Sequence, residues 1–422
     1  MIAVLVIALV AVLAAVAGLH WYVWRRLVRD TTARSGFARR AGTAVFVAGP
    51  LLMFGAVASE RAGAPFWLQQ VLAWPGFLWM TFALYLLLTV LAGEVVRPLL
   101  RRYLDRRSPA AGGEAGPVRE PVLVPAAEPD QPTKTPGAAT PDPARVLDPS
   151  RRLFVSRVVG GAAVVAATGI VGNGAYGVLR GPEVKRVTVP LARLPRAAHG
   201  FRIAVVSDIH LGPVLGQGFA QRVVDTINST QPDLIAVVGD VVDGSVEDLA
   251  PAVAPLAGLR ARHGTYYVTG NHEYFSGAEP WVEHVREIGL RPLANARVEI
   301  GAFDLAGVND VAGENYGDGP DYDKALGDRD PSRAAVLLAH QPVMIHEAVK
   351  HGVDLQLSGH THGGQLWPGN FVADAANPTL AGLERYGDTQ LYVSRGAGAW
   401  GPPVRVGAPS DITVVTLASK QA

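Results

Sequence analysis

The stretch Gly359-His360-Thr361-His362-Gly363-Gly364-Gln365 places two histidines one residue apart in a glycine-rich turn. It follows the apolar run 353–357, which we expect to be a strand. In an extended segment, residues i and i+2 point to the same side, so the sequence predicts that both imidazoles face one pocket and that Thr361 points away. Imidazole nitrogens presented in this way are potential metal ligands.

Four further polar clusters lie upstream, and each follows a short run of apolar, mostly branched residues. They are Asp208-Ile209-His210, Gly239-Asp240-Val241-Val242-Asp243, Gly270-Asn271-His272-Glu273 and His340-Gln341-Pro342. From Lys185 onward such runs alternate with helical segments, which predicts an α/β domain with its sites beyond the carboxyl ends of the strands. All five clusters occupy that position, so we expect them to meet.

The periodicity of the same region predicts individual elements. Predicted strands are 184–189, 202–206, 234–238, 265–268, 303–306, 335–338, 353–357, 391–394 and 412–417. Predicted helices are 218–228, 246–259, 281–288 and 343–350.

The polar clusters together supply oxygen and nitrogen donors for metal ions. The donors are Asp208, His210, Asp240, Asn271, His340, His360 and His362, with Asp243 and His272 beside them. This set exceeds what one small divalent ion takes, and a carboxylate can bridge two ions, so it indicates two metals about 3.5 to 4 Å apart. Imidazole ligands suit Mn, Fe, Zn or Ni better than Ca. The chain has no cysteine, so a thiolate site is excluded.

The order Asp-x-His, Gly-Asp-x-x-Asp, Gly-Asn-His-Glu, His, Gly-His-x-His resembles the calcineurin-like metallophosphoesterases over about residues 202–417. The resemblance implies a two-sheet αββα sandwich that hydrolyses phosphoric esters or pyrophosphates. It further implies the metal ligands: Asp208, His210 and His362 for one ion, Asn271, His340 and His360 for the other, and Asp240 bridging both. A hydroxide between the metals would attack phosphorus, His272 would protonate the leaving oxygen, and Asp243 would orient the His272 ring.

Flanking segments narrow the resemblance to a bacterial membrane-anchored branch, which includes enzymes that cleave the pyrophosphate of UDP-2,3-diacylglucosamine. These segments are Gly363-Gly364-Gln365, Asn377-Pro378, Tyr392-Val393-Ser394-Arg395-Gly396 and Trp400-Gly401-Pro402-Pro403. The Ser/Thr protein phosphatases carry an arginine where this chain has Gly244, which argues against phosphoprotein substrates. The branch often has paired aspartates where this chain has Asn309-Asp310, and the sequence assigns that pair no role.

The first 180 residues have a different character from the rest of the chain. Of 422 residues, 49% are hydrophobic and only 18% are charged, and the excess of apolar residues lies in this part. The runs 2–24, 42–59 and 72–92 are each close to the length of a membrane-spanning helix, and arginines cluster at 25–40 and 97–107. We therefore expect a membrane domain at 1–97, rather than core helices of a soluble domain. A net charge of +1 gives no indication of nucleic-acid binding.

Residues 98–150 read as a cytoplasmic linker, because the segment from Ser108 to Pro149 holds ten prolines without apolar periodicity. Arg151-Arg152 then precedes a glycine-rich apolar run in 151–180. This segment is interpreted as a fourth transmembrane anchor or as a twin-arginine-like export signal, and the two interpretations are compatible. Both place the domain at 185–422 on the outer side of the membrane.

We therefore expect a multi-pass protein of the cell membrane, with about four spans in the lipid bilayer and an extracytoplasmic phosphohydrolase domain. The expected substrates are phosphodiesters or pyrophosphates, with lipid- or wall-linked compounds favoured by location. Two alternatives remain open at this point. One is a phosphomonoesterase or cyclic-nucleotide phosphodiesterase on the same scaffold, and the other is a non-catalytic, metal-stabilised membrane receptor.

Overall fold

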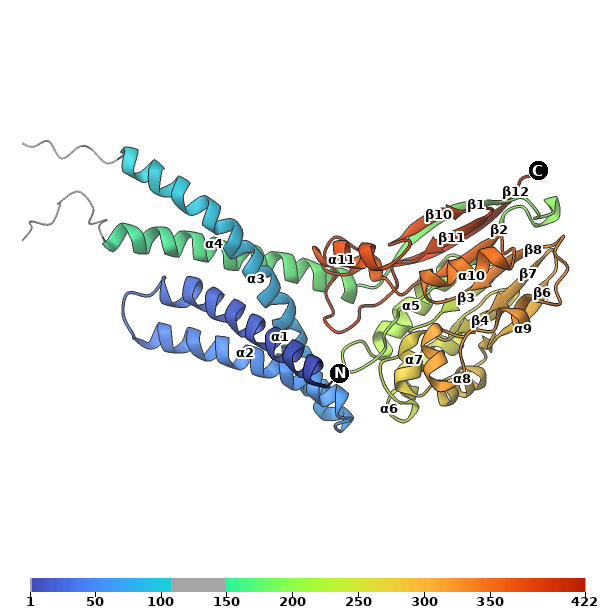
Figure 1. Ribbon diagram of the computed structural model, residues 1–422, viewed down its shortest axis with the longest axis horizontal. Coiled ribbons are helices and arrows are strands. Elements are labelled where there is room, and N and C mark those ends of the chain that lie inside the picture. The colour runs from blue at the N-terminus through green and yellow to red at the C-terminus, as the bar shows by residue number, and fades with distance from the viewer. Residues whose placement is uncertain (1, 108–148, 422) are drawn as a thin grey trace, which may run out of the picture. The chain divides into compact units, whose positions relative to one another are not determined.

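The structure, a computed structural model, describes residues 2–107 and 149–421 (Figure 1). The chain divides into two compact units. The first unit comprises two segments, one up to Phe46 and one from Leu86 to Ala166. The second unit comprises Val47–Tyr85 and the chain from Ala167 onward. The Pro-rich part of the predicted linker, residues 108–148, lies outside the described residues.

Four helices among the described residues are long and apolar enough to cross a membrane. They are α1 (Ile2–Trp24), which a π-helical turn extends to Arg29, α2 (Phe37–Arg61), α3 (Phe66–Arg107) and α4 (Pro149–Leu179). Helix α3 continues well beyond the predicted span 72–92, because Leu and Arg dominate residues 99–107 and both are strong helix formers. Arg151 and Arg152 lie inside the first turn of α4.

Charged side chains in the first unit pair with one another. Arg26 lies 3.2 Å from Asp30 and 3.0 Å from Glu94, and Glu94 also lies 3.3 Å from Arg97. Pairing offsets the cost of charges next to apolar helices.

The second unit contains two six-stranded sheets. In spatial order the first sheet is β1 (Glu183–Leu191), β12 (Asp411–Ser419), β2 (Phe201–Val206), β3 (Leu234–Val238), β4 (Thr265–Val268) and β5 (Arg291–Pro292). The second is β10 (Gly382–Tyr386), β11 (Thr389–Val393), β9 (Leu355–Ser358), β8 (Ala334–Leu338), β7 (Phe303–Gly307) and β6 (Ala296–Ile300). Within the first sheet β2 to β5 are parallel, and within the second β7, β8, β9 and β11 are parallel.

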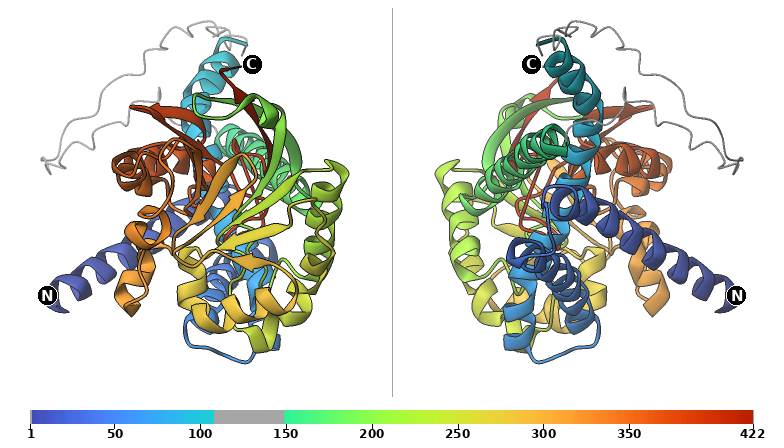
Figure 2. Two further views of the ribbon diagram at one scale, coloured as in Figure 1. Left: turned by 90° about the vertical axis from the view of Figure 1, so that its right-hand side faces the viewer. Right: turned by 90° about the vertical axis from the view of Figure 1, so that its left-hand side faces the viewer.

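Alternating residues of one strand serve two hydrophobic cores. Ile203 and Val205 of β2 point into the core between the sheets, and Ala204 and Val206 point into the core on the other face. That outer core is closed by α5 (Gln217–Ser229), α6 (Val246–Val253) and α8 (Ala278–Glu287), and a third core forms under α9 (Tyr322–Leu326) and α10 (Ile345–Lys350). Burial on both faces explains why the strands read as continuous apolar runs. The predicted two-sheet αββα sandwich is confirmed (Figure 2).

Several short elements differ from the sequence prediction. The predicted helix 246–259 is instead α6 followed by a 3₁₀ turn at Ala254–Gly258, because Pro255 has no N–H for the α-helical hydrogen bond. Strands β5, β6 and β10 and helix α11 (Gly369–Ala376) carry weak apolar periodicity and were not predicted. The edge positions of β6 and β10 account for their mixed, partly exposed composition.

Candidate metal centre

All nine predicted site residues follow the carboxyl ends of strands in the two sheets. Asp208 and His210 follow β2, Asp240 and Asp243 follow β3, and Asn271 and His272 open α7 (Asn271–Ser276) after β4; His340 follows β8, and His360 and His362 follow β9. Because these strands are parallel within each sheet, their carboxyl ends meet at one edge of the sandwich.

The backbone at this edge adopts the left-handed conformation repeatedly. Among non-glycine residues, φ is positive at Asp208 (52°), His210 (50°), Asp240 (53°), His360 (73°) and His362 (53°). Each such residue costs on the order of 1 kcal/mol or more, and clusters of them are typical of functional sites. The strain aims these side chains out of their loops and toward each other.

The expectation that His360 and His362 share one face of an extended segment is wrong. The segment is a 3₁₀ turn, His362–Gly364, with left-handed φ at both histidines. As a result the His362 ring approaches His210, whereas His360 Nδ1 lies 3.0 Å from Asn271 Oδ1. Thr361 does point away, because its hydroxyl donates to the carbonyl of Leu380 at 2.6 Å.

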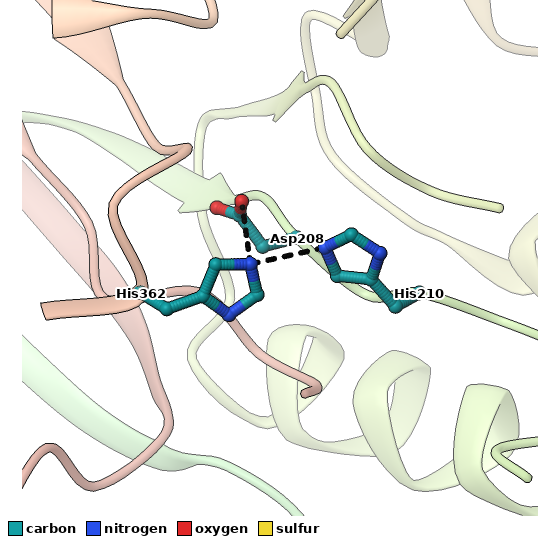
Figure 3. Close-up of side chains that lie close together, drawn as sticks. All are labelled: Asp208, His210 and His362. Carbon is teal, nitrogen blue, oxygen red and sulfur yellow. Dashed lines mark hydrogen bonds and ion pairs between the residues drawn. The ribbon is translucent and has the colours of Figure 1, made fainter. Parts of the chain in front are cut away.

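One set of side chains, the Asp208 group, consists of Asp208, His210 and His362 (Figure 3). His362 Nε2 lies 3.0 Å from His210 Nε2 and 3.3 Å from Asp208 Oδ1. All three residues are buried, and Ser207 donates a hydrogen bond to Asp208. Ligand atoms this close to one another match the demands of a single small cation.

A second set, the Asp240 group, consists of Asp240, His340 and His360. His340 Nε2 lies 3.0 Å from Asp240 Oδ2, and the same oxygen lies 3.9 Å from His210 Nε2. The Asp240 carboxylate therefore stands between the two groups. Burial alone would raise the pKa of Asp240, but the nearby His340, His272 and His210 lower that pKa overall.

The donor chemistry of both groups fits divalent metal ions. His340 is fully buried, its Nδ1 donates to the carbonyl of Val238 at 2.8 Å, and its Nε2 faces the Asp240 carboxylate at 3.0 Å. Imidazole and carboxylate donors together suit Mn, Fe, Zn or Ni.

Asp243 contacts two histidines at once. Its Oδ1 lies 2.6 Å from His272 Nδ1 and 2.9 Å from His210 Nδ1. Burial would lower the pKa of His272, but the hydrogen bond and the charge of Asp243 outweigh that effect and raise it to about 9. The same two histidines overcome the effect of burial on Asp243 and lower its pKa to about 2.

Glycine is required where loops from neighbouring strands touch. A Cβ on Gly270 would collide with Oδ1 of Asp240, and a Cβ on Gly359 would collide with Oδ2 of Asp208. The glycines of these two motifs thus permit the close approach of the carboxylates.

Glu273 organises the loops although sequence reasoning assigned it no role. Its buried carboxylate accepts hydrogen bonds from the backbone N–H groups of Asp240 at 2.9 Å, Val241 at 2.7 Å and Gly270 at 2.6 Å. Burial and the charge of Asp240 raise the pKa of Glu273 to about 7, although the backbone donors oppose the rise. The only sequence signal for this role of Glu273 is its position directly after His272.

Arg405 was also missed, and it braces His362. One guanidinium nitrogen, Nη2, lies 3.0 Å from His362 Nδ1, and Nη1 donates to the His362 carbonyl at 3.0 Å. Further bonds reach the carbonyls of Gly398, Ala408 and Arg395. Burial lowers the pKa of Arg405 to about 10. No motif marks this arginine, since it lies 43 residues after His362.

The unassigned pair Asn309-Asp310 lies next to the Asp240 group. Asp310 Oδ1 accepts from Gln341 Nε2 at 2.9 Å, and Gln341 directly follows His340. Asn309 donates from its side chain to Asp318 Oδ1 at 2.8 Å. Asp310 therefore anchors the loop that carries His340, whereas Asn309 holds the loop that carries Asp318.

Comparison with known proteins decides the family. The model of the calcineurin-like phosphoesterase family matches residues 201–364. A protein of Helicobacter pylori strain J99, described as an uncharacterised metallophosphoesterase, is 38% identical over 275 residues, which cover 64% of this chain and 74% of that protein. The chain belongs to the calcineurin-like phosphoesterases. As a member of this metallophosphoesterase family it is a phosphoester hydrolase, and the family uses divalent metal ions.

Other relatives combine the same domain with different chain lengths. A Bos taurus protein named transmembrane protein with metallophosphoesterase domain is 38% identical over 288 residues, covering 64% of each chain. A Bacillus subtilis metallophosphoesterase is 30% identical over 287 residues, covering 64% of this chain and 98% of that one. The name of the Bos taurus relative and the four apolar helices of this chain both point to a membrane protein.

Proposed function

We propose that this protein is a membrane-anchored, two-metal hydrolase of phosphodiester or pyrophosphate bonds, with its catalytic domain on the extracytoplasmic side. The observation that carries the proposal is Asp240 Oδ2, which lies 3.0 Å from His340 Nε2 and 3.9 Å from His210 Nε2. One carboxylate oxygen between two histidine groups is the arrangement expected for a bridging ligand.

The ligand assignment follows the two groups. Asp208, His210 and His362 would hold one ion, Asp240 would contact both, and His340 and His360 would hold the second ion. Asn271 would complete the ligand set of the second ion, because its Oδ1 lies 3.0 Å from His360 Nδ1. Two divalent ions in these positions would supply Lewis acidity and lower the pKa of water that they bind.

His272 is suited to protonate the leaving oxygen. Its Nδ1 contacts Asp243, which leaves Nε2 as the nitrogen available to a substrate. The rings of Phe275 and Trp400 lie 5.6 and 5.7 Å from the His272 ring and restrict its orientation. A pKa raised to about 9 keeps the ring protonated at neutral pH, and bound cations nearby would lower that pKa toward the range in which general acids work best.

The residue after Asp243 argues against phosphoprotein substrates. Gly244, which follows Asp243, offers no side chain to a phosphate, and its N–H donates to Ser276. Substrate recognition therefore depends on the metals and on the residues around His272. We assign diesters and pyrophosphates as the substrate class because the segments that flank the site motifs resemble the branch that includes enzymes cleaving the pyrophosphate of UDP-2,3-diacylglucosamine.

The orientation in the membrane follows from the arginines. They cluster between α1 and α2, at the end of α3 and at the start of α4. Arginine-rich flanks stay in the cytoplasm, so α4 would deliver the catalytic domain to the outer side. A C-terminal alkaline phosphatase fusion should be active. A C-terminal green fluorescent protein fusion should be dark if the domain is exported through the Sec pathway. The reverse pattern would place the domain in the cytoplasm.

The decisive test of activity uses the full chain purified in detergent and loaded with Mn²⁺. We expect hydrolysis of bis-p-nitrophenyl phosphate to exceed hydrolysis of p-nitrophenyl phosphate, and Asp240→Asn to abolish both. A preference for the monoester would favour a phosphomonoesterase on the same scaffold. Bound metal without turnover of either compound would favour a metal-stabilised receptor.

A further inference from the structure

Exposed apolar side chains surround one side of the metal centre. They are Phe275, Trp367, Phe371, Val372 and Trp400, and we refer to them as the apolar rim. Phe371 and Val372 are 64% and 73% exposed, and they belong to α11, a helix with no buried residue. A helix that contributes nothing to any core and still presents large apolar side chains is typical of an interaction surface.

The apolar rim is continuous with the metal loop. Trp400 exchanges two hydrogen bonds with the side chain of Gln365, its N–H donating at 3.0 Å and its carbonyl accepting at 2.9 Å. Gln365 follows the turn His362–Gly364, and a Cβ on Gly364 would collide with the backbone of Asn370 in α11. The Trp400 ring also packs against His272. The segments that carry the rim are therefore linked to one another from His272 to α11.

Two hydrogen bonds within the second unit also connect the rim and its neighbouring loop to helices that are long and apolar enough to span a membrane. The hydroxyl of Tyr85 in α3 donates to the carbonyl of Trp367 at 2.8 Å. The N–H of Arg405, in the loop that follows Trp400, donates to the carbonyl of Gly174 in α4 at 3.3 Å. Two candidate spans thus contact segments that follow the metal loop, at Trp367 and Arg405, which keeps the rim next to the apolar helices.

We propose that the apolar rim lies in the surface of the bilayer and that the metal centre opens onto it. Tryptophan and phenylalanine at such a boundary match the preference of aromatic residues for membrane interfaces. The rim is attached to helices that are long and apolar enough to cross a membrane, which favours the bilayer over a soluble protein as its occupant. The substrate class that fits is an amphiphile whose phosphoester lies beside His272 while its apolar tail stays in the membrane. This substrate assignment rests on the proposed function, whereas the lipid contact does not.

The lipid contact can be tested directly because the chain has no cysteine. Val372→Cys and the matched control Val349→Cys are labelled with an environment-sensitive fluorophore in the full chain, reconstituted in nanodiscs. Val349 is 39% exposed on α10, in a pocket lined by Arg193 and Lys420 rather than by site residues. We expect emission from position 372 to shift to the blue and to be quenched by lipids carrying a spin label near the headgroup. Equal, water-like emission at both positions would overturn the contact between the apolar rim and lipid. This holds also where a protein partner binds the rim.

The substrate assignment is tested by the ratio of two activities. Turnover of an amphiphilic phosphodiester in vesicles is divided by turnover of soluble bis-p-nitrophenyl phosphate. We expect Phe371→Ser/Val372→Ser to lower this ratio about tenfold and Val349→Ser to change it less than about twofold. An unchanged ratio in the double variant would overturn the assignment. If the wild-type protein hydrolyses neither compound while the label still reports lipid, the proposed function fails and the lipid contact stands.

Discussion

The Asp208 group and the Asp240 group contain the same kinds of ligand but are supported differently. In the first, side chains hold two of the histidines: Arg405 donates to the main-chain carbonyl of His362, and Asp243 contacts His210 Nδ1. In the second, His340 donates to a main-chain carbonyl of β3, at Val238, and His360 contacts the side chain of Asn271. A strand carbonyl cannot be removed by mutation, whereas a side chain can. The Asp208 group should therefore be the more easily altered half of the centre.

The largest effect is expected where the two groups meet. Asp240→Asn removes the charge that lies between His340 and His210. We expect loss of both metals and a fall in kcat of at least about a thousandfold, since both ions depend on that oxygen. Metal content by mass spectrometry and kcat on bis-p-nitrophenyl phosphate measure this. If only one metal were lost, Asp240 would belong to one group and the shared-ligand assignment would fall.

A smaller, purely catalytic effect is expected at His272, which belongs to neither group. His272→Ala should lower kcat about 100- to 1,000-fold while both metals stay bound. The loss should be greater for an aryl diester with a poor leaving group than for the p-nitrophenyl ester, because only a poor leaving group needs the proton. Equal losses for the two esters, or loss of metal, would contradict the role as an acid.

Substitution of Arg405 tests whether metal binding can be weakened in one group without the other. Arg405→Met should weaken metal binding at the Asp208 group about 10- to 100-fold and leave the Asp240 group within a few-fold. Arg405→Lys should restore little, because an ammonium cannot reproduce the hydrogen bonds to His362 and to the carbonyls of Gly398 and Arg395. Stepwise metal titration separates the two sites, and thermal unfolding at saturating metal controls for folding. Equal weakening of both sites would mean that Arg405 only supports the fold.

The smallest effect concerns the pH dependence of stability in metal-free protein. The pKa of His272 is raised to about 9, above its unfolded value of about 6.5, so its pairing with Asp243 stabilises the fold fully below pH ~6.5. This contribution is lost as the pH rises through about 9. In EDTA, the Tm of the wild type should exceed that of His272→Asn by a few degrees at pH 6 and by almost nothing at pH 10. A Tm difference independent of pH would show that the ring acts by packing rather than by charge.

Much of the centre could be predicted because each motif is local. Asp208-Ile209-His210 and Gly270-Asn271-His272-Glu273 each lie at the end of a buried strand, and parallel strands bring such ends together whatever the loops between them do. The apolar runs of β2, β3 and β8 were equally clear, since burial on both faces leaves no polar interruption. The weak elements, β5 and β10 among them, lie at sheet edges where composition is mixed.

Sequence alone thus determined the fold class, the apolar helices and the identity of the nine side chains that converge. The family resemblance implied how the ligands divide between two ions, and tertiary structure decided the backbone conformations and supporting contacts that divide them. The left-handed φ of His360 and His362 sends two neighbouring rings to different groups, and a single oxygen of Asp243 reaches both His210 and His272. Arg405 braces His362 across 43 residues of chain. Backbone conformation in a loop and contacts between distant loops depend on how all the strands are packed, and short-range residue patterns carry no record of that packing.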